Sequence, residues 1–129
     1  MDINQFVAAV DYNGEGFSPI WNYQGWRIAI SCDTPAAHLE NIELISKHME
    51  TDETFTLING SAELYIGDGA DNPGNVHRIV MEQGKTLVVK AGTWHFTVTH
   101  PGTKIIITEN ADTGDTNTVK KPFCPDMLV

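Results

Sequence analysis

Hydrophobic and polar positions alternate in short runs along most of the chain. After Gly25, β-branched and aromatic residues form eight runs between turn-forming residues: WRIAIS (26–31), IELISKHM (42–49), TFTLI (54–58), SAELYIG (61–67), VHRIVM (76–81), KTLVVK (85–90), WHFTVT (94–99) and TKIIITE (103–109). Runs of this length and spacing are typical of an antiparallel sandwich or barrel. A helical period is indicated only in PAAHLENIEL (35–44), where it predicts one helical turn. The pattern therefore predicts an all-β protein.

Glycine and asparagine mark the turns between these runs. Asn59 and Gly60 lie between two predicted strands, and this dipeptide is the strongest short signal for a β-hairpin. The longest polar gap, DGADNPGN (68–75), predicts a surface loop.

The length of 129 residues predicts a single domain, residues 1–129, with a barrel core at about 25–110. The segments 1–24 and 111–129 are interpreted as extensions that pack on the core or on a partner subunit. The first is rich in aromatic residues and the second ends in Met-Leu-Val, so we expect a homodimer.

Composition and charge exclude some function classes. The chain has 17 acidic and 8 basic residues, a formal net charge of −9, which disfavours nucleic acid and anionic membrane surfaces. No apolar stretch approaches the roughly 20 residues of a membrane span, and the start has no signal-peptide pattern. Cys32 and Cys124 have no paired spacing and are expected to be free thiols. We therefore expect a cytoplasmic protein.

Three residues with metal-ligand chemistry fall on positions that can meet. Side chains alternate between the faces of a strand, so His48 shares a face with Ser46, and His95 shares one with Thr97. Glu53 shares a face with Phe55 at the start of the next run. If these faces point inward, two imidazoles and one carboxylate converge in one cavity. Such a set can hold a divalent ion and leave positions open for a ligand.

Residues 46–60 and 84–99 resemble the two motifs of the cupin superfamily. In the first motif Glu53 is followed by six residues and then Gly60; in the second, Gly84 leads through Ala91-Gly92 to His95 at the expected spacing. The resemblance implies a small cupin β-barrel, an antiparallel double-stranded β-helix or jelly roll. It also implies a metal site at His48, Glu53 and His95.

The chain departs from the motifs at three positions. Ser46 stands where the first histidine is usual, Lys90 where the proline is and Thr99 where the asparagine is. Metal-binding cupins commonly use three histidines and one glutamate, so one of four ligands is missing. A divalent ion such as Fe, Mn, Ni or Zn is therefore expected with weaker binding or a more open coordination, and a metal-free pocket is the alternative.

Two functions remain open from the sequence. One is a metal-dependent lyase, isomerase or oxygenase that acts on a small polar metabolite with a carbonyl, carboxylate or ureide-like group. The stretch TWHFTVTHPGTKIIITENADTGDTN is weakly similar to the ureidoglycolate lyase type, which implies the ureide. Without a metal, Glu53 is expected to act as a catalytic general base with a pKa raised by burial. The other function is a non-catalytic or metal-free cupin that binds a small molecule.

Other candidate residues have ordinary structural interpretations. Arg27 is expected to face water or to reach a carboxylate substrate. A solvated loop is expected to hold the acidic residues Glu109, Asp112 and Asp115. Structural or exposed positions are expected for His38, His77 and His100. Four aromatic residues either pack in the core or an interface or wall a ligand pocket: Trp21, Trp26, Trp94 and Tyr65.

Overall fold

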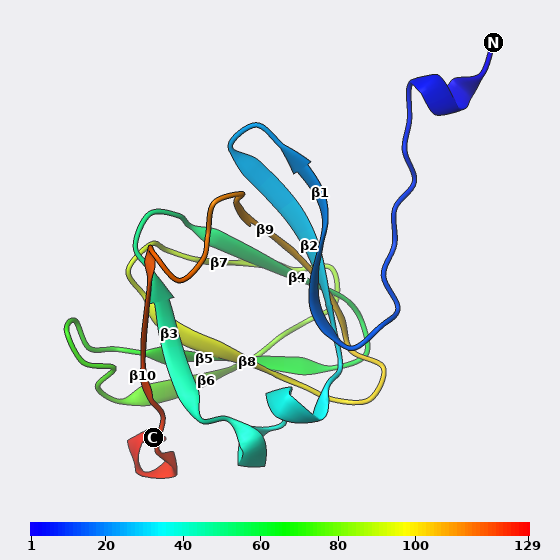
Figure 1. Ribbon diagram of the computed structural model, residues 1–129. Helices are drawn as coiled ribbons and strands as arrows, with labels where there is room; N and C mark the ends of the chain where they lie inside the picture. The colour runs from blue at the N-terminus through cyan, green and yellow to red at the C-terminus, as the bar shows by residue number, and fades with distance from the viewer.

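Two five-stranded antiparallel sheets form the protein in a computed structural model that describes residues 1–129 (Figure 1). Sheet A has the order β1 (Gly16–Tyr23), β2 (Trp26–Cys32), β9 (Lys104–Asn110), β4 (Glu53–Asn59) and β7 (Thr86–Val89). Sheet B has the order β10 (Thr118–Pro122), β3 (Leu44–His48), β8 (Trp94–Thr99), β5 (Ala62–Gly67) and β6 (Val76–Val80). Four short 3₁₀ helices complete the chain: η1 (Ile3–Gln5), η2 (Pro35–Ala37), η3 (Leu39–Asn41) and η4 (Pro125–Met127). None of the helices has the length and apolar character that crossing a membrane requires.

All eight runs predicted from the sequence form strands, and the predicted helical turn forms η2 and η3. Two further strands, β1 and β10, lie outside the range 25–110 that was expected for the barrel core. Neither segment has the residue pattern of a strand, because β1 contains Pro19 and Asn22 and β10 has the sequence TVKKP. Such edge strands are held by pairing with one neighbour, β2 and β3 respectively, and need no apolar alternation.

The hairpin expected at Asn59-Gly60 is wrong. The turn exists, and Gly60 has a positive φ of 70°. A side chain at Gly60 would also collide with the backbone of Gly102, because a Cβ there would lie 2.7 Å from the Gly102 carbonyl carbon. However, β4 belongs to sheet A and β5 to sheet B, so the turn carries the chain from one sheet to the other. The local signal specified the turn and left the partner strands open.

Two apolar clusters form on the two faces of sheet B. The first lies between the sheets and takes residues from both: Ala29, Phe55, Leu57, Ala62, Leu64, Met81, Val89, Ile105 and Ile107. The second covers the outer face of sheet B, where the C-terminal segment and η3 pack on it: Ile45, Tyr65, Val76, Trp94, Phe96, Val98 and Phe123. Strands β8 and β5 inside sheet B are therefore buried on both faces, which explains why β5 is apolar at the consecutive positions Leu64, Tyr65 and Ile66.

The two ends of the chain differ. The segment before β1 projects away from the sheets (Figure 1), and its apolar side chains, including Phe6 and Val7, are exposed. Its last part is tied to the body because Lys104 Nζ lies 2.8 Å from both Asp11 Oδ1 and Asn13 Oδ1. The C-terminal segment instead enters sheet B through β10 and buries Phe123.

Candidate metal centre

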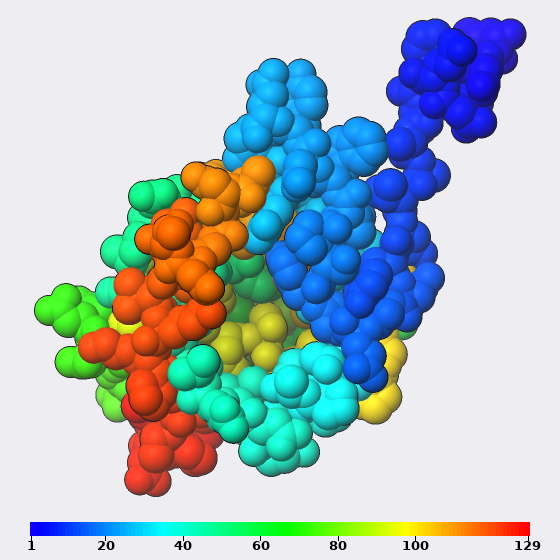
Figure 2. Space-filling model, viewed as in Figure 1, coloured from blue at the N-terminus to red at the C-terminus, as the bar shows by residue number.

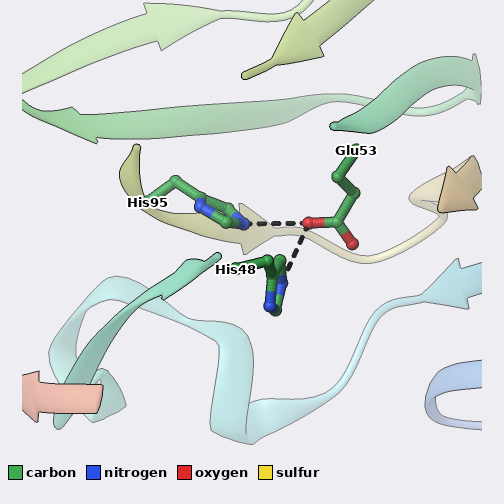
Figure 3. Close-up of side chains that lie close together, drawn as sticks. All are labelled: His48, Glu53 and His95. Carbon is green, nitrogen blue, oxygen red and sulfur yellow. Dashed lines mark hydrogen bonds and ion pairs between the residues drawn. The ribbon is translucent and has the colours of Figure 1, made fainter. Parts of the chain in front are cut away.

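His48, Glu53 and His95 meet between the two sheets. His48 ends β3 and His95 lies in β8, both in sheet B, while Glu53 begins β4 in sheet A. Glu53 Oε1 lies 2.9 Å from His95 Nε2 and 3.2 Å from His48 Nε2 (Figure 3). Each of the three residues offers one ligand atom, and these three atoms all lie within 4.8 Å of one another. The bend at residues 49–52 thus carries the chain from one sheet to the other and lets His48 and Glu53 face each other.

The remaining nitrogen of each imidazole has a partner that orients the ring. His95 Nδ1 lies 2.9 Å from the Thr93 carbonyl oxygen, which only accepts, so Nδ1 is a donor and Nε2 points at the centre. His48 Nδ1 lies 2.8 Å from Thr118 Oγ1 in β10. Histidine ligands of metals in proteins almost always carry such an outer hydrogen bond. No sequence pattern pointed to Thr118, because its contact with His48 depends on the pairing of β3 with β10. Thr93 acts through its backbone carbonyl, which every residue has.

The donor set fits a divalent transition metal ion. Donors that each lie about 2.1 Å from one ion are roughly 3.0–3.4 Å apart at angles between octahedral and tetrahedral values. The two distances to Glu53 Oε1, 2.9 and 3.2 Å, agree with that spacing, and the two imidazole nitrogens lie within 4.8 Å of each other. Two imidazoles and one carboxylate are also the ligand types that Fe, Mn, Ni and Zn accept. His48, Glu53 and His95 would hold the ion.

The same contacts set the charges of the site. Burial alone would raise the pKa of Glu53, but hydrogen bonds from His48 and His95 outweigh it and hold that pKa well below its usual range. The hydrogen bond to Glu53 in turn raises the pKa of His48, against the opposing effect of burial. The expectation that burial raises the pKa of Glu53 toward the working range is therefore wrong. An ionised carboxylate is a good ligand for a cation and a weak general base.

A second carboxylate, Glu109, lies beside this centre. Arg27 Nε donates to Glu109 Oε2 at 2.9 Å, and Arg27 also reaches the carbonyl oxygens of Ala111 and Thr113. Burial, followed by the neighbouring Glu53 carboxylate, raises the pKa of Glu109 to about 7, although Arg27 acts in the opposite direction.

The expected solvated position of Glu109 is wrong, because the residue is 5% exposed inside β9. Asp112 and Asp115 do lie in the exposed segment that follows. The alternation of side chains along β9 could have predicted this burial, because Ile105, Ile107 and Glu109 share the inward face of the strand. Arg27 likewise faces inward to a carboxylate of the protein itself.

An open cavity leads to the centre. One lobe of about 260 Å³ is lined by Arg27, Ser46, His48, Glu109 and Thr118 among others, and a second lobe of about 340 Å³ is lined by Ser46, Glu53 and His95 among others. Figure 2 shows the mouth as a hollow at the middle of the molecule. The β1–β2 hairpin (blue), the segment after β9 (orange) and the segment before β3 (cyan) surround it.

Ser46 lines both lobes, so the position at which metal-binding cupins usually have the fourth ligand faces the cavity. Strand pairing places Ser46 directly opposite His95 on one side and Lys120 on the other. A small hydroxyl at this position leaves space next to the two imidazoles. The departure from the motif therefore opens the centre toward the ligand cavity.

The other candidate residues lie away from this centre. His38 pairs with Asp33, His77 with Asp68 and His100 with Glu63. Trp94 is fully buried on the outer face of sheet B, while Trp21 and Trp26 are 47% and 42% exposed. None of the three tryptophans walls the cavity that leads to the metal centre.

Solved structures with a similar fold include a cupin. No family model matches the sequence, and no curated protein matches it. A cupin-2 domain containing protein from Shewanella frigidimarina has a TM-score of 0.56 at 19% identity over 77% of this chain and 84% of that one. Pac13 of Streptomyces, described as a nucleoside dehydratase, is represented by a complex with uridine that has a TM-score of 0.60 at 8% identity over 91% of this chain and 88% of its own. A protein from Neisseria meningitidis has a TM-score of 0.51 at 16% identity over 86% and 98%.

The chain therefore has the cupin fold, as its two motifs implied. At these identities the likeness concerns the fold, and the function has to come from the site.

Proposed function

We propose that the protein is a metal-dependent enzyme that acts on a small polar metabolite with a carbonyl, carboxylate or ureide-like group. The observation that carries this proposal is the meeting of His48, Glu53 and His95 at metal-ligand spacing beside an open cavity. The fold neighbours add support, because Pac13 is described as an enzyme and was solved with a small polar ligand, uridine.

The residues of the chain have distinct roles in this proposal. A bound divalent ion would polarise an oxygen of the substrate. Thr93 and Thr118 orient the two imidazoles, and Glu53 supplies the negative charge that attracts the cation. Glu109, with its pKa near neutrality, stands beside the cavity as a group that can hold or release a proton at its carboxyl oxygens. Ser46 leaves room for the substrate.

A second candidate is a metal-free cupin that binds a small molecule with or without turnover. The observation that favours it is Ser46, which removes one of the usual four ligands. The two contacts of His48 and His95 also give the Glu53 carboxylate hydrogen-bond partners without an ion.

Elemental analysis of protein purified without added metal tests the proposal. We expect about one transition metal ion per chain, lost in His95→Ala and in Glu53→Gln. His77→Ala is the matched control, because His77 is an exposed histidine that pairs with Asp68. Folded wild-type protein that stays metal-free after incubation with Fe²⁺, Mn²⁺, Ni²⁺ and Zn²⁺ would establish the second candidate instead.

We also propose that the protein is a cytoplasmic homodimer. Support comes from the apolar side chains that the projecting N-terminal segment exposes, and from two free thiols, Cys32 and Cys124, which suit a reducing compartment.

A further inference from the structure

A second cavity, of about 470 Å³, lies on the outer face of sheet B. Its floor is formed by β5, β6 and β8, and its wall by η3 and the turn that follows β8. Alternation along β5 separates it from the metal centre: Leu64 packs between the sheets, whereas Glu63 and Tyr65 point outward. The cavity shares no lining residue with the two lobes that lead to the metal centre. Its volume lies in the range of small-molecule sites, roughly 300–1,000 Å³.

A buried carboxylate faces this cavity. Glu63 is 8% exposed, and its partner is the ring of His100, with Nε2 at 2.9 and 2.8 Å from the two carboxylate oxygens. A carboxylate has about four acceptor positions, and one N–H fills only part of them. The His100 side chain is 42% exposed and sits at the rim. Glu63 thus offers free acceptor capacity to a donor that enters the cavity.

A phenol and a guanidinium face the same cavity without partners. Tyr65 is 3% exposed and stacks on Phe96, with ring centroids 4.8 Å apart, yet its hydroxyl makes no hydrogen bond within the chain. Arg78 forms no ion pair and no hydrogen bond. It lies directly opposite Tyr65 in the β5–β6 pair, so both side chains stand on one face. The ring is buried but the hydroxyl is not sealed off from solvent, so it can take a partner from a molecule in the cavity that Tyr65 lines.

The spacing of these groups selects the ligand chemistry. Glu63 pairs with Val80, so Arg78 is its diagonal neighbour, at about 7–8 Å between the backbones. A simple anion would meet Glu63 and Glu40, and a simple cation would meet Arg78. A molecule with an ammonium group and a carboxylate a few ångströms apart satisfies both ends. Leu39, Val98 and Pro101 supply an apolar wall for its side chain.

We propose that this cavity is a second small-molecule site, which binds a zwitterion of the amino-acid type with its ammonium group on Glu63 and its carboxylate on Arg78 and the Tyr65 hydroxyl. The site acts independently of the metal centre, because sheet B separates the two. An enzyme with this arrangement has a place for a second metabolite besides its substrate.

Calorimetric titration of the whole protein with individual L-amino acids, β-alanine and γ-aminobutyrate tests the proposal. EDTA is present throughout, so that amino acids cannot give a signal by chelating an ion at His48, Glu53 and His95. We expect at least one of these compounds to bind with a Kd in the range of micromolar to about 1 mM. The N-acetyl derivative, which lacks the ammonium group, and the amide, which lacks the carboxylate, are each expected to bind at least about tenfold more weakly.

Two variants locate the binding. Arg78→Met changes an exposed residue and is expected to weaken binding about tenfold or more, and Tyr65→Phe keeps the stacking but removes the hydroxyl, for a loss of about fivefold. Lys85→Met, which removes an exposed cation that pairs with Glu82, is the matched control. His95→Ala is expected to bind the compound as wild type does.

The proposal fails if none of the compounds binds at millimolar concentration, or if binding survives Arg78→Met and Tyr65→Phe unchanged. It also fails if Arg78→Met changes the oligomeric state in sedimentation, because the cavity would then be part of an interface between chains.

Discussion

Ser46 is the residue whose substitution tests the open coordination most directly. It faces the cavity opposite His95, so a histidine there adds a third imidazole next to the other ligands. We expect Ser46→His to raise the affinity for Zn²⁺ or Co²⁺ by about tenfold or more, measured by competition with a chelator. Ser46→Ala is the control and is expected to keep the wild-type affinity. Equal affinities of all three proteins would show that position 46 does not reach the ion.

Thr118 is predicted to act as a positioning residue for His48. Its hydroxyl lies 2.8 Å from His48 Nδ1 and holds the ring so that Nε2 faces Glu53. We expect Thr118→Val to lower the affinity for Zn²⁺ about 10- to 100-fold, in the range found for outer partners of ligating histidines. Thr118→Ser restores the hydroxyl and is expected to restore most of the affinity. A loss that is the same in both variants would point to packing of the methyl group instead.

Glu109 is predicted to make the stability of the metal-free protein depend on pH. Its pKa is raised from 4.5 to about 7, so the folded protein keeps a proton that the unfolded chain gives up. The folded state therefore loses stability as the pH rises from about 4.5 to 7. The lowered pKa of Glu53 adds no slope in this window, because its contribution is complete above 4.5.

Wild type is expected to lose about 2 kcal/mol more of its free energy of unfolding between pH 5 and pH 7 than Glu109→Gln loses. Urea unfolding in the presence of EDTA at pH 5, 6 and 7 measures it. The raised pKa of His48 also lowers stability toward the upper end of the range, and Glu109 contributes to that shift, so the difference between the two proteins measures Glu109 together with its effect on His48. Parallel curves for wild type and variant would contradict the prediction.

At the scale of elements, alternation within a run was the most informative part of the sequence. It placed His48 and Ser46 on one face of β3 and His95 on the inner face of β8, as the structure has them. It gave no information on pairing between strands, because the alternation of one strand is the same whichever neighbour it has. The sequence therefore predicted the turn at Gly60 but wrongly paired the two strands beside it as a hairpin. For the same reason the contact of Thr118 with His48 could not be predicted.

The C-terminal segment is predicted to contribute strongly to the stability of sheet B. Phe123 is 8% exposed and packs edge-on against Phe96, with ring centroids 4.7 Å apart. Replacing it with alanine leaves a cavity in the outer cluster, at a cost of about 3–4 kcal/mol in the free energy of unfolding. Val119→Ala, on exposed β10, is the control and is expected to cost less than about 0.5 kcal/mol. Chemical denaturation with both variants checks the difference, and similar costs would show that Phe123 is not part of the core.

At the scale of the whole molecule, the two faces of sheet B carry different sites. The inner face holds the candidate metal centre and the outer face holds the cavity of Glu63, Tyr65 and Arg78. The sequence pointed to the first, because its ligands fall in motifs with fixed spacing. It gave no sign of the second, since Glu63, Arg78 and His100 come together only through the pairing of β5 with β6 and β8.

The projecting N-terminal segment is predicted to carry the contact between subunits. Its apolar side chains Ile3, Phe6, Val7 and Val10 are 46–69% exposed. The segment itself projects away from the two sheets (Figure 1). A terminus of this kind stays ordered only when it is tied to something, and a second copy of the chain can bury it.

We expect wild type to sediment as a dimer and a chain that lacks residues 1–10 as a monomer. The truncation keeps Asp11 and Asn13, which hold Lys104, so the fold and the metal content should be unchanged. A full-length chain with serine at the four apolar positions serves as the matched variant and should also be a monomer. If both altered chains remain dimers, or wild type is monomeric at high concentration, the subunit contact lies elsewhere or does not form.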